Sequence, residues 1–421
     1  MTLIKTSLLN GIAVVIKMLT LLGLNKILAI YVGPAGYAAL GQFQNAVQMI
    51  TTFASGALNT GVTKYTAEYY EDEASQHVVW RTAGMIALIG SLATAGLVII
   101  FNQSLAGWFL KDESLGSVFI WFAATLVLFV FNTLLLAILN GKKEIRRYVV
   151  ANIAGSVFSL VVTSVMAIRL GLYGALVALA IYQSLTFFVT FMLTYKAPWF
   201  KFRYLLGGID KQAAKNLGKY TVMALTSAAC VPVSHILIRN HLGETLGWDV
   251  AGNWEALWRL SGAYMMLFMT TLSVYFLPKY AEIKSITLIK KELFKGYSLL
   301  LPFFILLVLF IYVFQDFLIV TIFTKEFLTI KDALGWQLFG DVLKFGSWMV
   351  AFLMHSKGLY KLFVVSEVLF SILFYFLAVY LSSTFGFKGM GIAHAINYAA
   401  YWIFVIFSVF HVLKKISDPD L

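Results

Sequence analysis

Three polar residues share one face of a helical stretch that is otherwise apolar. Gln337, Asp341 and Lys344 fall at positions i, i+4 and i+7 of the string WQLFGDVLK, which places them in one stripe. Burying two opposite charges costs less when they pair, so we expect Asp341 and Lys344 to contact each other. The pair is either a salt bridge that fixes packing or a switch that opens when a proton or an anionic substrate arrives.

Two further pairs of polar residues are spaced by about one helical turn. His235 and Arg239 share a face of one apolar stretch, and Glu255 and Arg259 share a face of the next. The second pair is either a structural ion pair or part of a binding site. Arginine side chains at such a depth would attract an anionic ligand.

Two lysines interrupt the first apolar stretch of the chain. Lys17 and Lys26 lie half a rotation apart on a straight helix, so they line one cavity only if the helix bends, which Gly23 would allow. Lys26 is equally well explained by snorkelling to the nearer membrane surface, whereas Lys17 is too deep for that. The predicted binding residues are the cationic group Lys17, Lys26, His235, Arg239 and Arg259. The predicted coupling or gating residues are Gln337, Asp341, Lys344 and Glu255.

The sequence lacks the usual signatures of enzymes and of metal sites. No GxxxxGK[ST] loop is present, so we do not expect hydrolysis of a nucleoside triphosphate. The 6 histidines show neither HExxH spacing nor a cysteine partner for zinc. Cys230 is the single cysteine, which leaves no disulfide framework. We therefore expect a protein that is not an enzyme and that carries no metal or cofactor.

Composition indicates a membrane protein. The chain is 60% hydrophobic and only 12% charged, and its mean hydropathy is +0.84. The net charge of +12 does not indicate nucleic-acid binding, because the basic residues lie in short loops between apolar runs. These runs are near 20 residues long, enough to cross a bilayer as helices. We predict an all-α membrane protein with about twelve transmembrane helices. The expected spans are 8–32, 37–70, 78–101, 117–140, 149–170, 175–195, 221–241, 254–283, 297–314, 334–354, 362–382 and 390–413.

The two halves of the chain repeat the same polar landmarks. Gly41-Gln42-Phe43-Gln44 corresponds to Gly252-Asn253-Trp254-Glu255, at an offset of roughly 210 residues. We predict an N-terminal lobe over residues 1–195, a basic cytoplasmic linker over 196–219 and a C-terminal lobe over 220–421. The segment 284–296 is amphipathic and basic and is expected to lie on the inner membrane surface. Most lysines and arginines fall on one side of the predicted topology, which predicts that both termini are cytoplasmic.

Several strings of the sequence resemble one family of transporters. They are Val32-Gly33-Pro34-Ala35-Gly36, Gly61-Val62-Thr63-Lys64-Tyr65, Ser273-Val274-Tyr275-Phe276-Leu277-Pro278 and above all Trp336-Gln337-Leu338-Phe339-Gly340-Asp341-Val342-Leu343-Lys344. On these strings the chain resembles the bacterial O-antigen and enterobacterial-common-antigen lipid flippases (Wzx type) of the multidrug/oligosaccharidyl-lipid/polysaccharide (MOP) exporter superfamily. The resemblance covers essentially the whole chain.

The resemblance implies two pseudo-symmetric six-helix lobes arranged in a V, as in MATE-like transporters. It implies an undecaprenyl-pyrophosphate-linked oligosaccharide that is moved from the cytoplasmic to the periplasmic leaflet of the bacterial inner membrane by alternating access. It also implies coupling to an H⁺ or Na⁺ gradient, and a polymerase and a chain-length regulator of the same pathway as partners.

Two other functional classes fit parts of the sequence. A MATE-like exporter of small molecules or drugs would share the fold, but cationic drugs favour an acidic cavity and this chain has more bases than acids at membrane depth. A membrane scaffold without transport would not need the buried polar stripe of Asp341 and Lys344.

Overall fold

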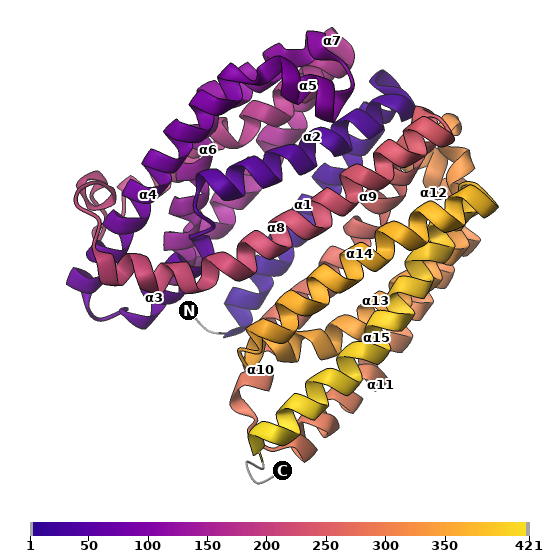
Figure 1. Ribbon diagram of the computed structural model, residues 1–421. Helices are drawn as coiled ribbons and strands as arrows, with labels where there is room; N and C mark the ends of the chain where they lie inside the picture. Colours follow the sequence, from indigo (N-terminus) through magenta and orange to yellow (C-terminus); the bar gives the residue numbers. More distant parts are fainter. Residues whose placement is uncertain (1–2, 418–421) are drawn as a thin grey trace. The chain divides into compact units, whose positions relative to one another are not determined.

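The computed structural model describes residues 3–417, and within that range the chain forms helices and no strand (Figure 1). The predicted all-α fold is therefore confirmed. Contacts divide the chain into two compact units. Unit 1 contains Met1–Val32 and Ala39–Pro232, and unit 2 contains Gly33–Ala38 and Val233–Leu421. Each unit is described by itself below.

Unit 1 is built from the helices of the N-terminal half. They are α1 (Leu3–Tyr31), most of α2 (Gly33–Ala54), α3 (Asn59–Glu68), α4 (Glu73–Ile100), α5 (Asn102–Leu110), α6 (Gly116–Gly141), α7 (Ile145–Tyr195) and the first part of α8 (Lys211–Thr245), with 3₁₀ turns at Glu113–Leu115 and Phe202–Leu205. The predicted helix over residues 37–70 is in fact two helices, α2 and α3. It is interrupted because Gly56 and Ala57 both have positive φ angles, at 61° and 54°.

Unit 2 continues from α8 through the rest of the chain. Its helices are α9 (Trp248–Thr271), α10 (Leu277–Glu282), α11 (Ile286–Val313), α12 (Gln315–Ile322), α13 (Lys331–Ser356), α14 (Tyr360–Phe385) and α15 (Lys388–Ser417), with a π-helical turn at Leu272–Phe276 and a 3₁₀ segment at Lys325–Ile330. The basic segment 284–296, predicted to lie on the inner membrane surface, forms from residue 286 onward the first turns of α11 and is continuous with its apolar part.

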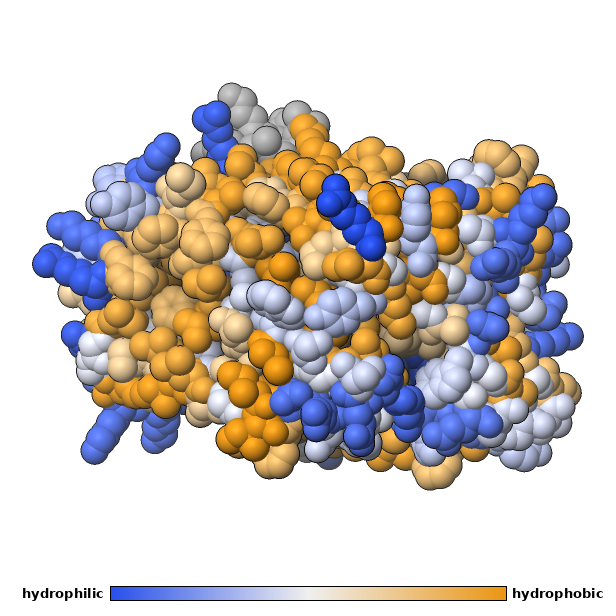
Figure 2. All heavy atoms as spheres, turned by 90° about the horizontal axis from the view of Figure 1, so that it is seen from above, coloured by the Kyte–Doolittle hydropathy of each residue, from blue (hydrophilic) through white to orange (hydrophobic). Residues whose placement is uncertain are grey.

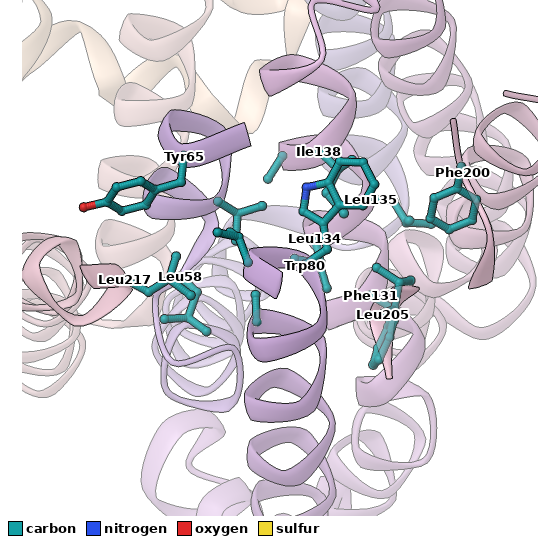
Figure 3. Packing of buried hydrophobic residues seen from close by; sticks show 14 of the residues in the cluster. Leu58, Tyr65, Trp80, Phe131, Leu134, Leu135, Ile138, Phe200, Leu205 and Leu217 are labelled. Carbon is teal, nitrogen blue, oxygen red and sulfur yellow. The ribbon is translucent and has the colours of Figure 1, made fainter. Parts of the chain in front are cut away.

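The core of unit 1 gathers around one buried tryptophan. Trp80 is fully buried and packs with Leu134, Leu135 and Ile138 of α6 (Figure 3), while its indole Nε1 donates to Thr66 Oγ1 at 2.8 Å. The predicted linker contributes to this core, because Ala197, Phe200, Leu205 and Leu217 are buried in it. These linker residues are therefore an integral part of unit 1.

The long helix α7 contains the turn predicted between two spans. Gly171 has φ 58° and ψ −137°, which breaks the helical path. Gly174 then packs so close to the Met166 carbonyl oxygen that a Cβ would overlap it. Glycine is needed at both positions, first for the conformation and then for the close approach.

Seven helices of the described chain are long and apolar enough to cross a membrane. Large apolar side chains such as Phe294, Val313 and Phe407 stay more than two-thirds exposed, which is typical of lipid-facing surfaces. Figure 2 shows broad hydrophobic areas on the visible face, with hydrophilic residues gathered in separate clusters. The protein is therefore a multi-pass membrane protein. The long helices α2, α8, α9 and α13 are more polar and are not among the seven, so the number of crossings stays a prediction.

Within unit 2, α13 lies in the middle of the packing. It contacts α9, α11, α14 and α15, and its glycines allow the closest approach to α15. A Cβ on Gly340 would overlap the His394 ring, and one on Gly346 would overlap Trp402. The polar stripe of α13 is thereby held against residues of α15 and α9.

The short segment Gly33–Ala38 is the part of α2 that belongs to unit 2. Tyr37 is fully buried, with its ring 5.9 Å from that of Phe323 and 5.1 Å from that of Phe327. The Pro34 carbonyl oxygen sits where a Cβ of residue 252 would be, so only Gly252 fits there. This close approach brings Tyr37 to the polar residues of α9.

Candidate functional site

A buried carboxylate in unit 2 is shared by two arginines. Glu255 Oε2 accepts a hydrogen bond from Arg239 Nη2 at 2.9 Å, and its Oε1 accepts one from Arg259 Nε at 2.9 Å. Arg239, Glu255 and Arg259 are 1%, 7% and 9% exposed. The predicted pair of Glu255 and Arg259 is thus present, but it is part of a triad that also includes Arg239 of α8. Two guanidinium groups and one carboxylate leave this triad with a net positive charge.

Aromatic rings cover both guanidinium groups. The Arg259 guanidinium carbon lies 5.2 Å from the centre of the Tyr37 ring, and that of Arg239 lies 5.5 Å from the centre of the Trp254 ring. Ring faces attract cations, so they stabilise the two guanidinium groups beside the shared carboxylate. The arrangement keeps two cationic groups buried among apolar helices.

A second buried cluster surrounds Asp341 of α13. Its Oδ2 accepts hydrogen bonds from the Ser261 hydroxyl at 2.7 Å and from the Tyr264 hydroxyl, both on α9. Its Oδ1 lies 2.9 Å from Nε2 of His394 on α15, and both side chains are fully buried. Three donors from two neighbouring helices therefore converge on this one carboxylate, which is the arrangement that a buried charge requires.

Lys344 lies in a box of aromatic rings. Its ammonium is 4.5 Å from the centre of the Trp258 ring, 4.8 Å from that of Trp348 and 5.2 Å from that of Tyr398. Asp341 and Lys344 attract each other electrostatically, but no ion pair within 4.0 Å joins them in this structure. Asp341 pairs with His394 instead, and ring faces take the place of a carboxylate around the ammonium.

The remaining predicted residues lie in different surroundings. Gln337 is fully buried, and its Nε2 donates to Ser261 Oγ at 3.4 Å, which joins it to the Asp341 cluster. His235 is half-buried between Trp254 and Trp258, with ring centres 5.2 and 4.5 Å away. Lys17 and Lys26 belong to unit 1, where Lys17 is exposed and Lys26 is half-buried on the continuous helix α1.

Unit 2 therefore gathers seven of the nine predicted residues into one polar region within apolar helices. Helices α8 and α9 carry the arginine triad. Helix α13 carries Gln337, Asp341 and Lys344, and Asp341 contacts residues of α9 and α15. Across residues 3–417 no group of three or more His, Cys, Asp or Glu side chains is arranged to hold a metal ion. The chemistry available here is charge recognition and proton exchange.

Comparison with known proteins gives these residues a context. Over residues 3–284 the sequence matches the family described as polysaccharide biosynthesis protein. The chain belongs to this family. The lipid III flippases of Escherichia coli (strain K12) and Shigella flexneri are each 28% identical to it over 404 residues, which is 96% of this chain and 97% of each relative. The family resemblance drawn from the sequence is thereby confirmed.

Solved structures with the same fold are transporters of the MOP superfamily. The inward-facing form of a multidrug resistance MATE transporter has a TM-score of 0.77 at 16% identity, covering 95% of this chain and 96% of that one. A MOP superfamily transporter from Pyrococcus furiosus, described as having a binding pocket of reverse polarity, has a TM-score of 0.72 at 16% identity, covering 98% and 96%. At this identity the likeness shows the fold, which is that of MOP superfamily transporters.

Several residues of the site were not predicted from the sequence. Ser261 and Tyr264 are spaced i, i+3 on α9, and His394 is a histidine within an apolar span, so all three residues could have been found from the sequence. The aromatic box of Trp258, Trp348 and Tyr398 carried none, because tryptophan and tyrosine are common in apolar helices. Only their arrangement around Lys344 distinguishes them.

Proposed function

We propose that this protein is a flippase that moves an undecaprenyl-pyrophosphate-linked oligosaccharide, an O-antigen or enterobacterial-common-antigen unit, from the cytoplasmic to the periplasmic leaflet. The proposal is supported by the family and by the lipid III flippases that are similar over nearly the whole chain. A pyrophosphate with polar sugars does not cross hydrocarbon unaided, because its polar groups would lose their water. A protein must therefore supply a polar, positively charged passage.

The observation that carries the proposal is the arginine triad. Arg239 and Arg259 share one carboxylate at low exposure, so the triad itself has a net positive charge that attracts an anionic headgroup. Guanidinium groups bind phosphate oxygens through paired hydrogen bonds, and these bonds are strong where water is scarce. Lys17, Lys26 and His235 are proposed to assist as further positive or polar contacts, while the lipid tail stays in the bilayer.

Transport is proposed to use alternating access coupled to a proton gradient. Asp341 and His394 form a pair that can gain one proton and so become more positive by one charge, which would alter the packing of α13 against α15. Sodium is the less suitable ion here, because hydroxyl and imidazole groups already occupy both carboxylate oxygens. Gln337 and Lys344 lie on the same helix, α13, and are proposed to change their contacts when this packing changes.

The protein is proposed to reside in the bacterial inner membrane with both termini in the cytoplasm. This follows from the excess of lysine and arginine in one set of loops. A polymerase and a chain-length regulator of the same pathway are its proposed partners, since they would act on the glycan after it reaches the periplasmic leaflet.

The direct test uses purified protein in liposomes that carry a fluorescent polyprenyl-pyrophosphate sugar. Exposure of the label in the opposite leaflet is followed over time, with and without a pH gradient. We expect transfer of this lipid and little transfer of the same lipid without its pyrophosphate, because the uncharged lipid cannot bind the arginines. Equal transfer of both lipids would refute the role of the charge.

A MATE-like exporter of small molecules is the second candidate, because the fold is shared with multidrug transporters. A cationic drug would need an acidic site, whereas Arg239, Arg259 and Lys344 outnumber Glu255 and Asp341 in this region. Extrusion of a cationic dye from cells, without transfer of any glycolipid in liposomes, would favour the exporter.

A further inference from the structure

A pocket at one end of unit 2 combines positive charge with an apolar wall. It lies between the start of α11 and the end of α15 and has a volume of about 530 Å³. Lys290 and Lys414 are its lysines, and no carboxylate lines it. Its apolar wall is formed by Leu293, Phe294, Ile406, Phe407 and Phe410.

The lining residues are available to a ligand from outside the protein. Lys290 and Lys414 are exposed, and the residues Phe294 and Phe407 are 73% and 72% exposed. The Lys290 ammonium lies 5.5 Å from the centre of the Phe410 ring, so it is held over the pocket wall. The Tyr297 hydroxyl is already engaged, since it donates to the Gly346 carbonyl and accepts from Trp402 Nε1. The pocket therefore offers cations and apolar surface and few other polar groups.

The apolar wall continues from this pocket along the membrane-spanning part of both helices. Ile403 of α15, one turn before Phe407, is 60% exposed. Ile305 and Tyr312 of α11 lie on the same side of their helix as Phe294 and are 37% and 50% exposed. Both helices are long and apolar enough to cross the membrane. A ligand that fills the pocket and follows this wall must be anionic at one end and a hydrocarbon along the rest.

We propose that this pocket is a binding site for one anionic phospholipid of the surrounding membrane, with its phosphate between Lys290 and Lys414. The acyl chains lie along Phe294 and Phe407 and continue over the exposed faces of α11 and α15. A lipid-linked glycan fits less well, because the wall offers no amide or carboxylate groups for sugar hydroxyls. The site lies outside the arginine triad and the Asp341 cluster and does not depend on the proposed flipping activity.

A second pocket of about 600 Å³ lies on the other side of Phe294. It is lined by Lys279, Lys291 and Lys295, but it also contains Glu292, whose Oε1 accepts from the Tyr275 hydroxyl at 2.9 Å. This carboxylate would repel a phosphate, so the pocket between α11 and α15 is the better site. The lysines around the second pocket still raise the concentration of anionic lipid near the first.

The test measures lipid binding to the purified full-length protein by native mass spectrometry. Phosphatidylglycerol and phosphatidylcholine are titrated separately, and the dissociation constant of the first bound lipid is compared. Each of the two lysines attracts the lipid phosphate. The double variant Lys290→Gln/Lys414→Gln should therefore raise the dissociation constant for phosphatidylglycerol at least about tenfold. Lys388→Gln, at the opposite end of α15, is the matched control and should leave binding unchanged.

Three results would overturn the proposal. The first is equal affinity of the wild type for the anionic and the zwitterionic lipid. The second is displacement of phosphatidylglycerol by inorganic phosphate alone, which would mean an anion site without a lipid. The third is displacement of phosphatidylglycerol by an equimolar polyprenyl pyrophosphate, which would assign the pocket to the transported substrate. Unchanged melting temperatures of the variants without added lipid would show that they are folded.

Discussion

The imidazole Nε2 of His394 lies 2.9 Å from Oδ1 of Asp341, and neither side chain is exposed. The two residues come from α15 and α13, so the pair joins separate helices. Lys344, which is closer to Asp341 in sequence, lies among aromatic rings and forms no ion pair with it in the described structure. The proton exchange that we propose for this region therefore involves a carboxylate and an imidazole.

Replacing Asp341 should make the rate of lipid transfer independent of the proton gradient. In Asp341→Asn the carboxylate that pairs with His394 is lost, while the shape and one oxygen acceptor for Ser261 and Tyr264 remain. We expect transfer in liposomes at least about tenfold slower than that of the wild type and insensitive to an imposed pH gradient. His394→Gln should show the same insensitivity. A gradient response of normal size in both variants would remove the pair from the coupling mechanism.

Exchanging the charges of Asp341 and Lys344 should not restore function. The double variant Asp341→Lys with Lys344→Asp places an ammonium among the donors of Ser261, Tyr264 and His394. It also places a carboxylate against the aromatic box, whose ring faces repel it. We expect an inactive protein with a lower melting temperature. Transport near the wild-type level would instead mean that the two residues pair during the cycle.

Two single substitutions, Lys344→Arg and Lys344→Gln, test whether transport needs a positive charge inside the aromatic box. Arginine keeps the interaction with the rings, so Lys344→Arg should retain most of the transport activity. Lys344→Gln removes the charge and should lower transport at normal protein levels.

Removing the shared carboxylate should be more harmful to stability than removing one arginine. Glu255→Gln removes the carboxylate that Arg239 and Arg259 share and leaves two buried positive charges side by side, which costs about 3–5 kcal/mol. Arg239→Met leaves a balanced pair of Glu255 and Arg259. We expect Arg239→Met to stay folded but to transport poorly, because the positive charge of the triad is gone. The melting temperature and the liposome assay together separate the two effects.

Gly252→Ala should displace the segment Gly33–Ala38 from its packing against α9 and lower the stability of the protein. The added methyl group overlaps the Pro34 carbonyl oxygen, and overpacking of this kind costs about 1–3 kcal/mol. Gly262→Ala on the same helix is the control, because nothing lies within 4 Å of the added atom. The control should be as stable as the wild type or slightly more so, since alanine favours helix. Equal melting temperatures for both variants would contradict the close approach.

Membrane topology is tested by reporter fusions. Fusions after Lys111 and Lys331 should report the periplasm, and fusions after Lys211 and Lys415 the cytoplasm. A periplasmic signal at Lys211 would reverse the proposed orientation, because that residue begins α8 in the most basic connection of the chain.

The fold and the charged site could be predicted to different extents. Apolar runs and glycine turns are local signals, so the positions of most helices and the break at Gly171 followed from the sequence. The i, i+4 spacing likewise predicted that Glu255 and Arg259 pair. The partner of Asp341 could not be found this way, because His394 reaches it from another helix. Spacing along one helix suggested Lys344 instead, and only packing reveals that aromatic rings surround that ammonium.

The polar helices α8, α9 and α13 also bear on how the chain enters the membrane during synthesis. None of them is among the seven helices that are long and apolar enough to cross a membrane, so a polar partner stabilises each of them when it leaves the translocation channel. Arg239 and Glu255 lie on consecutive helices, and their ion pair can form as soon as the α8–α9 hairpin is made. When α13 follows, the hydroxyls of Ser261 and Tyr264 are already in place for Asp341. His394 is made last, so the Asp341 site is completed only when α15 has entered the bilayer.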